Sequence, residues 1–554
     1  MTSDPFGIGS TFKTISSAWL TDPQECTRAQ QELATIAWIL NFNAISYLMG
    51  INPAPIANAA EGDERFSDAV WRENPGYCMM MQNYLAYTRT IERIVYDMRG
   101  ASTADAHRAA FWIRQWFNAM APSNFFWTNP EAIHKAWHSG GATVLRGFEN
   151  LLADLQAADL RMVDSTPFEL GNNIANTPGA VVFRNELMEV IQYHPLSEQV
   201  RAIPIVVVPP WINKYYILDL NEKVSMVRYL LSEGFSVFII SWKNPDAKMA
   251  DSSYEDHVLD GALTAIEVAR TVCAVPQVHA VGYCIGGTAL ATLMAWLNRK
   301  YPNPAHVPVA HWSLLASLTD FSRPGEIASF INEESIATLD ELMAKQGYLD
   351  AKQIGWSFRM LRPNSQIWRY VVHKFLYGEA VPALDVLAWN ADSIRLPRTT
   401  HSFCLHDLYV ENKLAQKDAI TLRGYAIDLT RISQPLYAVG ATVDHITPWR
   451  GTYAITSLVG GPARYALSTS GHILGIVNPP DAHSKHEYWA GDAGSVADGK
   501  AWLATQTKQS GSWWPDWSAW LHQRCGSMQT PVAQESVHYP PLCDAPGTYV
   551  REKS

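Results

Sequence analysis

The sequence predicts an α/β fold: a mostly parallel, twisted sheet with helices on both faces, preceded by an α-helical N-terminal domain. Residues 1–175 consist mainly of helical stretches, whereas short β-branched runs alternate with helical stretches from residue 176 onward. Such alternation is typical of parallel strands joined by crossover helices. In addition, one apolar run ends in a glycine-rich turn and continues as a helix, in residues 278–297.

The N-terminal region shows apolar residues at helical spacing. In residues 31–40, Leu33, Ile36 and Leu40 share one face with Ala37, and residues 110–120 form an aromatic helix of the same kind. Such faces usually pack on a core, although attachment to an apolar surface or to another protein is the alternative. Between them, charges and aromatics precede a proline that is expected to end a helix, so the sequence predicts a structured loop there.

The clearest strands are apolar runs that each end in turn residues, namely 203–208, 236–241, 278–281 and 436–439. They place a sheet domain over residues 176–554, and the motifs described below make it the expected catalytic domain. Residues 322–425 interrupt this pattern with many aromatics. We interpret that segment as an inserted cap over the carboxyl edge of the sheet.

Composition excludes several classes of protein. The 554 residues are 47% apolar and 17% charged, which is typical of a globular chain of two or three domains. The net charge of −10 argues against nucleic acid as a partner, because such proteins need a basic face. Residues 1–7 give no sign of a secretory signal, and no apolar run is long enough for a transmembrane segment. A cytoplasmic protein is therefore expected.

Seven cysteines are scattered along the chain without a Cys-x-x-Cys pair or Cys/His ligand spacing. We therefore expect no disulfide and no structural zinc. Nor do we expect any other metal or a cofactor. A reducing compartment suits a free, reactive thiol.

Chemistry is indicated by Gly282-Tyr283-Cys284-Ile285-Gly286, a Gly-x-Cys-x-Gly nucleophile elbow in which sulfur replaces oxygen. Glycines on both sides permit a sharp turn from strand to helix, and the following helix N-terminus favours a thiolate. Taken alone, Cys284 fits a small buried hydrophobic residue equally well. The rest of the chain must therefore supply a base and an acid.

Two residues meet that requirement in the order of the α/β-hydrolase triad. Asp444 directly follows an apolar strand, and His472 follows the next strand candidate at residues 464–467. Each has a simpler alternative, since Asp444 fits a turn acid before Thr-Pro and His472 fits a strand cap or a partner of a backbone carbonyl. His445 is the rival base, and we interpret it as a supporting residue.

An oxyanion site needs backbone N–H groups directed at the developing charge. Ile285, directly after the nucleophile, should supply one of them. The loop after the strand at 203–208 should supply the other. Its two prolines have no N–H, so the candidates are Trp211, Ile212 and the Asn213 amide, although the loop fits rigid packing equally well.

With these motifs, the chain resembles the polyhydroxyalkanoate (poly-3-hydroxybutyrate) synthases, which build storage polyesters from 3-hydroxyacyl-CoA. The blocks that carry the resemblance are residues 63–75, 124–131, 209–219, 282–287, 444–445, 471–472, 511–517 and 545–550. They spread over most of the chain and look like the class I forms that need no second type of subunit.

The resemblance implies that Cys284 carries the acyl group, that His472 is the general base and that Asp444 is the acid. It also implies a homodimer, and an N-terminal domain that supports dimerisation and association with storage granules in the cytoplasm. The expected partners are 3-hydroxyacyl-CoA, the growing polyester chain, the granule surface and granule-associated proteins. Residues 471–480 look nearer the short-chain group, but Leu474 stands where a small residue is expected, which leaves the preferred monomer length open.

Two other functions are compatible with these motifs. A cysteine-triad thioesterase or polyester depolymerase shares the fold and the triad, although the cysteine in the elbow counts against hydrolysis. A non-catalytic protein at the granule surface is the second alternative, although such a role does not require Cys284, Asp444 and His472 together.

Overall fold

The computed structural model describes residues 4, 6–51, 53–481, 483–494, 496–532 and 538–553. Residues 1–3 and 5, part of the stretch in which we find no secretory signal, lie outside the described residues. The chain forms two compact units, a helical unit and a sheet unit. The helical unit comprises residues 1–164, 328–338 and 356–383, and the sheet unit comprises residues 165–327, 339–355 and 384–554.

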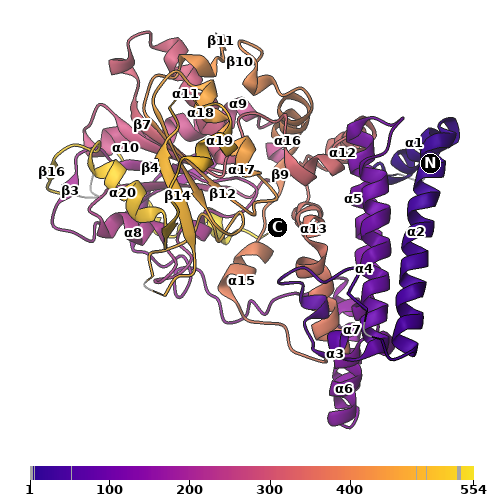
Figure 1. Cartoon of the computed structure of the whole chain (residues 1–554). Coiled ribbons are helices and arrows are strands. Elements are labelled where there is room, and N and C mark those ends of the chain that lie inside the picture. The colour runs from indigo at the N-terminus through magenta and orange to yellow at the C-terminus, as the bar shows by residue number, and fades with distance from the viewer. Residues whose placement is uncertain are drawn as a thin grey trace. The chain divides into compact units, whose positions relative to one another are not determined.

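Helices dominate the first 164 residues of the helical unit (Figure 1). They are α1 (Ile8–Thr21), α2 (Pro23–Leu48), α3 (Val70–Glu73), α4 (Pro75–Tyr96), α5 (Thr103–Ala119), α6 (Pro130–His138) and α7 (Ala142–Ala157). The predicted helices at 31–40 and 110–120 are confirmed within α2 and α5. Leu40 is buried and Ile36 packs against the same cluster, as the predicted face requires.

The proline in the predicted loop corrects one expectation. Pro75 begins α4 instead of ending a helix, and the Asn74 side chain accepts hydrogen bonds from the first backbone N–H groups. Proline suits the first helical position because the N–H that it lacks would have no partner there. The charged and aromatic run before it forms only short turns, including α3.

The sheet unit is built on a sheet in the order β15-β14-β13-β12-β7-β6-β4-β5-β2-β1-β17. Its strands are β1 (Gly179–Arg184), β2 (Met188–Tyr193), β4 (Ile205–Val208), β5 (Val237–Trp242), β6 (Val278–Tyr283), β7 (Val309–Leu315), β12 (Leu436–Ala441), β13 (Ala463–Ser468), β14 (Glu487–Asp492), β15 (Gln509–Ser510) and β17 (Cys543–Asp544). The predicted strands are confirmed as β4, β5, β6, β12 and β13. Short strand pairs join β3 (Val200–Arg201) to β16 (Met528–Gln529), β8 (Tyr348–Leu349) to β9 (Leu396–Pro397) and β10 (Thr421–Leu422) to β11 (Tyr425–Ala426).

The central strands β5, β4, β6, β7, β12 and β13 run parallel. From β4 the chain moves to β5 on one side and then returns to β6 on the other. Such a reversal of strand order opens a crevice at the carboxyl ends of the strands, where α/β proteins bind their ligands. The loops after β4 and β6 meet at this crevice.

Helices cover both faces of the sheet, as predicted. Those of the unit include α8 (Met226–Ser232), α9 (Tyr254–Asp256), α10 (Thr264–Cys273), α11 (Ile285–Lys300), α17 (Trp449–Tyr453), α18 (Ile455–Leu458), α19 (Gly499–Ala504) and α20 (Trp514–His522). Alternate strand residues such as Val207 and Ile239 form one buried cluster with α8 and α20. The intervening positions face the other side, where α10 and α11 contact β5 and β6.

The predicted insertion at 322–425 does not fall within one unit. Residues 328–338 and 356–383 belong to the helical unit, and the remainder belongs to the sheet unit. Likewise, the N-terminal part of the helical unit ends at residue 164, whereas the sequence predicted a boundary at residue 175. The insertion contains α12 (Glu333–Gln346), α13 (Ala351–Leu361), α14 (Arg369–Val371), α15 (Asp385–Ala391), α16 (Arg398–Phe403) and the π-helical turn η11 (Cys404–Val410). Its role as a cap stays a prediction.

Across the ranges that the structure covers, no helix has the length and apolar character needed to span a bilayer.

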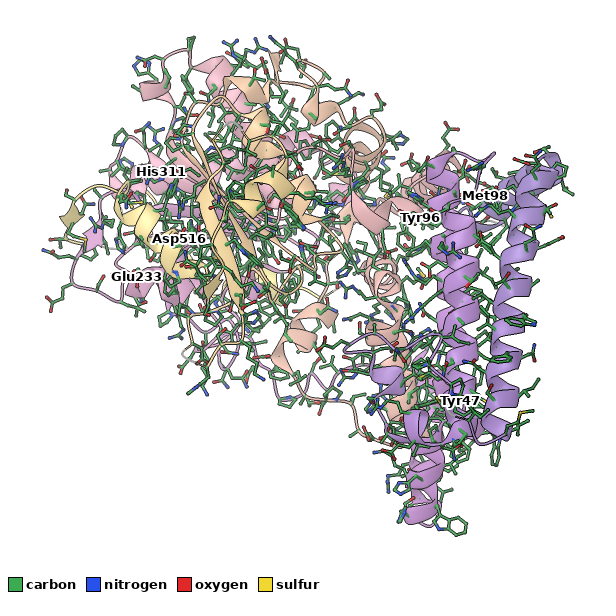
Figure 2. The ribbon with its side chains drawn as sticks, viewed as in Figure 1. Tyr47, Tyr96, Met98, Glu233, His311 and Asp516 are labelled. Atoms are coloured by element: carbon green, nitrogen blue, oxygen red, sulfur yellow. The ribbon has the colours of Figure 1, made fainter. Side chains whose placement is uncertain are left out.

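A buried chain of hydrogen bonds ties α20 to the sheet (Figure 2 labels His311). The Nδ1 atoms of His279 and His311 lie 2.6 Å apart, and His311 Nε2 lies 3.2 Å from the Arg524 carbonyl oxygen. Because that oxygen only accepts, His311 Nε2 carries the hydrogen and its Nδ1 accepts from His279. His279 Nε2 then accepts from the Ser313 hydroxyl at 3.0 Å, whose oxygen accepts from Trp517 Nε1. These donors and acceptors are those of two neutral imidazoles, the form that burial favours.

This arrangement predicts a loss of stability in acid. Burial lowers the pKa of His279 well below its ordinary value and that of His311 to about 4. The unfolded chain, whose histidines titrate at about 6.5, therefore binds protons first, so stability is complete above that pH and falls toward pH ~4. We expect the free energy of unfolding in urea to fall by roughly 1 to 3 kcal/mol per histidine over this interval.

Replacing His311 by glutamine should make this pH dependence less steep, because glutamine donates and accepts but does not titrate. The matched control is His306→Gln at an exposed position, which should keep the wild-type slope. An unchanged slope in the His311→Gln variant would contradict the assignment.

Candidate active site

Cys284 occupies the turn between β6 and α11 with φ 52° and ψ −126°, a backbone conformation that residues other than glycine rarely adopt. Close approach of the backbone requires glycine on both sides. A Cβ on Gly282 would lie 2.4 Å from Gly287 Cα, and a Cβ on Gly286 would lie 2.4 Å from the Val208 carbonyl oxygen. The half-buried thiol thus sits on a strained elbow, at the crevice between β4 and β6.

The predicted acid and base meet at the neighbouring strand ends. Asp444 follows β12, His472 follows β13, and His472 Nδ1 lies 2.7 Å from Asp444 Oδ2. Asp444 also accepts from the backbone N–H groups of Ile446 at 2.8 Å and Thr447 at 2.9 Å, and from the Thr447 hydroxyl at 2.7 Å. Asp444 is therefore a turn acid and the partner of the histidine at once.

The charges of the three side chains are coupled. Burial by itself would lower the pKa of His472, but the Asp444 carboxylate and a hydrogen bond with Cys284 outweigh burial and raise it above the ordinary value. Burial would raise the pKa of Asp444, but His472 and Thr447 lower it. The arrangement favours an imidazolium held between a carboxylate and the thiol, so the predicted cysteine, aspartate and histidine lie together.

The oxyanion candidates lie at the same edge of the sheet. Ile285 is the first residue of α11, where a backbone N–H has no partner within the helix. The close contact between Gly286 and the Val208 and Pro209 carbonyl oxygens brings the loop after β4 to the elbow. In that loop, Trp211 packs its ring against both Trp242 and His257, and Asn213 forms a backbone bridge with Ser393. Their role as donors stays a prediction.

His445 lies in the Asp444 turn, and its carbonyl oxygen approaches Gly325. Because Asp444 bonds to His472, the geometry favours His472 as the base, and the supporting role of His445 stays a prediction.

Three residues near the site were missed in the sequence. Thr447 Oγ1 lies 3.3 Å from His472 Nδ1, and the Tyr283 hydroxyl donates to the His472 carbonyl oxygen at 3.2 Å. The third residue is Tyr409, on η11. Burial is the main cause that raises the pKa of its phenol, and the interaction with Cys284 adds to this effect. Only Tyr283, next to the nucleophile in the motif, had a local signal that points to the site.

Removing the carboxylate tests the coupling of the three groups. In Asp444→Asn the pKa of His472 should fall, because the amide does not stabilise an imidazolium. The pH at which the His472 ring loses its proton, followed by NMR of the ring protons, should then move downward by about 1 to 3 units. The exposed Asp251→Asn substitution is the control and should leave the profile unchanged. A wild-type profile in Asp444→Asn would contradict the coupling.

The strand order, the elbow and the strand-end acid and base define a protein of the α/β-hydrolase fold. Comparison with known proteins narrows this class. The family model described as "Poly-beta-hydroxybutyrate polymerase (PhaC) N-terminus" matches residues 62–230. A poly(3-hydroxyalkanoate) polymerase of Methylorubrum extorquens is 36% identical over 98% of this chain and 90% of its own length. The corresponding subunit of Cupriavidus necator is 38% identical over 89% of this chain and 83% of its own.

The chain belongs to the poly(3-hydroxyalkanoate) polymerase family. Among solved structures, an esterase from Exiguobacterium antarcticum covers 54% of this chain and 92% of its own, with 13% sequence identity and a TM-score of 0.30.

Proposed function

We propose that this protein is an acyltransferase that polymerises (R)-3-hydroxyacyl groups from CoA into a storage polyester, with Cys284 as the acyl carrier. Membership of the polymerase family supports the reaction. The observation that carries the residue assignment is the bond between His472 Nδ1 and Asp444 Oδ2, at 2.7 Å, beside the strained Cys284 turn.

The reaction proceeds in two transfers. The Cys284 sulfur attacks the thioester carbonyl carbon, the carbon–sulfur bond to CoA breaks, and CoA leaves as the thiol with a proton from His472. The 3-hydroxyl group of a second acyl unit then attacks the acyl-cysteine while His472 takes its proton. A new ester forms and Cys284 is released. The first transfer exchanges one thioester for another, so the acyl group stays activated, whereas a serine ester would lose that activation.

Asp444 is proposed to orient and charge the base and not to take the proton of the hydroxyl itself. A carboxylate offers about four acceptor positions. In Asp444 these are used by the Ile446 N–H, the Thr447 N–H, the Thr447 hydroxyl and His472. Its side chain is also completely buried, so a substrate hydroxyl has no vacant position to approach.

Ile285 and the loop at Trp211 to Asn213 are proposed to supply the oxyanion donors. Support comes from the first-turn position of Ile285 and from the contact of Gly286 with the Val208 carbonyl oxygen. Donors fixed before the reaction stabilise the negative charge of each tetrahedral intermediate.

Supplying 3-hydroxybutyryl-CoA and following free CoA, free hydroxy acid and polymer tests the function. The wild-type protein should release CoA and make polymer, and Cys284→Ala should lower CoA release at least a thousandfold, because no acyl carrier remains. Cys26→Ala, another half-buried cysteine, is the matched control and should keep full activity. Free hydroxy acid without polymer would favour the thioesterase alternative, and release of CoA by Cys284→Ala would reject the nucleophile.

We further propose that the protein acts in the cytoplasm at the surface of storage granules, as a homodimer, and that the granule contacts α7. This helix turns its polar side inward: Lys374 Nζ bonds to Asp154 Oδ2 at 2.5 Å, and Asn150 Nδ2 donates to the Lys374 carbonyl oxygen at 3.0 Å. Its opposite side exposes Val144, Leu145, Phe148, Leu151, Leu152 and Leu155. An apolar polyester surface is a suitable occupant for such a face.

Replacing Leu145, Phe148 and Leu152 together by serine should lower co-sedimentation with amorphous polyester particles about tenfold or more, because the apolar area available for burial is lost. Glu149→Ser, a substitution on the same helix, should leave binding unchanged. If the triple variant binds like the wild type, α7 is not the granule contact.

A further inference from the structure

Lys214 lies directly after the candidate oxyanion loop and places a charged ammonium inside the protein. Its side chain is 3% exposed. The Nζ atom lies 2.7 Å from the Val550 carbonyl oxygen, 2.9 Å from the Glu552 carbonyl oxygen and 2.7 Å from Asp392 Oδ1. An ammonium has three hydrogens, and these three acceptors use all of them.

The acceptors come from two segments that are distant in the sequence. Val550 and Glu552 belong to the C-terminal segment, which contains the short helix η14 (Tyr549–Arg551). Asp392 follows α15 and also accepts from the Tyr216 hydroxyl at 2.9 Å. Trp389 Nε1 on α15 donates to the Lys214 carbonyl oxygen at 2.8 Å. The lysine thereby holds three segments together at one point.

The C-terminal segment is itself fixed independently of Lys214. The fully buried carboxylate of Glu189 on β2 accepts from the backbone N–H groups of Thr548 at 3.0 Å and Tyr549 at 3.1 Å, and from the Thr548 hydroxyl at 2.7 Å. Val550 is buried in the main core. Lys214 therefore binds a segment whose position is already fixed on the sheet.

Holding a loop with a buried ammonium is unfavourable in one respect, because the charge loses its hydration. Burial disfavours the charged ammonium and lowers the pKa of Lys214, against the opposing effect of Asp392. An apolar side chain of the same length would avoid that cost, but apolar contact has no direction. Three hydrogen bonds of defined direction fix the position of the loop far more narrowly.

We propose that Lys214 is a positioning residue: by binding the C-terminal segment and Asp392, it fixes the loop from Trp211 to Asn213 so that a backbone N–H meets the oxyanion of the acyl transfer. This inference rests on the proposed function, because only a reaction with a tetrahedral intermediate needs such a donor. Small displacements matter here, since a misplacement of about 1 Å costs roughly a hundredfold in rate.

The test compares Lys214→Met with Lys214→Arg in the full-length protein. In Lys214→Met, kcat for CoA release from 3-hydroxybutyryl-CoA should fall about 10- to 100-fold, with KM changed less than about threefold, because the transition state loses more than the bound substrate. The rate at which iodoacetamide alkylates Cys284 should stay as in the wild type. Lys214→Arg, which keeps the charge and donors, should recover part of the lost kcat.

A substrate analogue separates positioning from loss of structure. In a dithioester of CoA the carbonyl oxygen is replaced by sulfur, a weaker hydrogen-bond acceptor. The wild type should prefer the ordinary thioester, and this preference should shrink in Lys214→Met. Lys243→Met is the matched control, since Lys243 lies over the Tyr549 ring and touches the same segment without holding the loop. It should keep the wild-type preference.

If Lys214→Met folds poorly, Asp392→Asn provides the same test more mildly, because it keeps the lysine and its two carbonyl partners. Two outcomes would overturn the positioning role. The first is an unchanged kcat and an unchanged substrate preference in both variants. The second is a fall in kcat that Lys214→Arg does not recover, together with an equal fall in the rate of Cys284 alkylation. A wild-type protein that releases no CoA would instead refute the proposed function.

Discussion

The bond between His472 and Asp444 is the interaction on which the site depends. It joins the loops after two adjacent parallel strands, β12 and β13, where the Asp444 side chain is fully buried and the His472 side chain is 7% exposed. A buried carboxylate and a buried imidazole are each unfavourable alone, but together they stabilise the charged form of the histidine. The cysteine then has an imidazolium beside it, and the same ring is the proposed donor and acceptor of protons in the two proposed transfers.

The remainder of the sheet unit holds that pair and Cys284 in position. Parallel pairing places the ends of β4, β6, β12 and β13 along one edge, so residues separated by long stretches of sequence meet there. Glycines at the elbow allow α11 to approach the loop after β4 closely, which brings Ile285 and the candidate donors of that loop to the same crevice. The ammonium of Lys214 is a further contact of this kind, because it fixes that loop to a segment near the end of the chain.

Much of this arrangement follows from local patterns. Apolar runs bounded by turn residues gave the central strands, and the order of Cys284, Asp444 and His472 gave the candidate site, because each lies just past a strand of a parallel sheet. The rest depends on long-range contacts that leave no periodic signal. Examples are the Thr447 hydroxyl on Asp444 and the assignment of residues 356–383 to the helical unit, where Lys374 meets Asp154. The expectation for Pro75 was wrong because proline suits a helix start as well as a helix end.

The most direct measurement is mass spectrometry of the protein quenched in acid shortly after mixing with limiting 3-hydroxybutyryl-CoA. The account predicts that the peptide containing Cys284 gains the mass of a 3-hydroxybutyryl group or a short oligomer of it, and that hydroxylamine removes the added mass, as expected for a thioester. CoA release with no acyl group on Cys284 at any time, or with the acyl group on a different residue, would contradict the account.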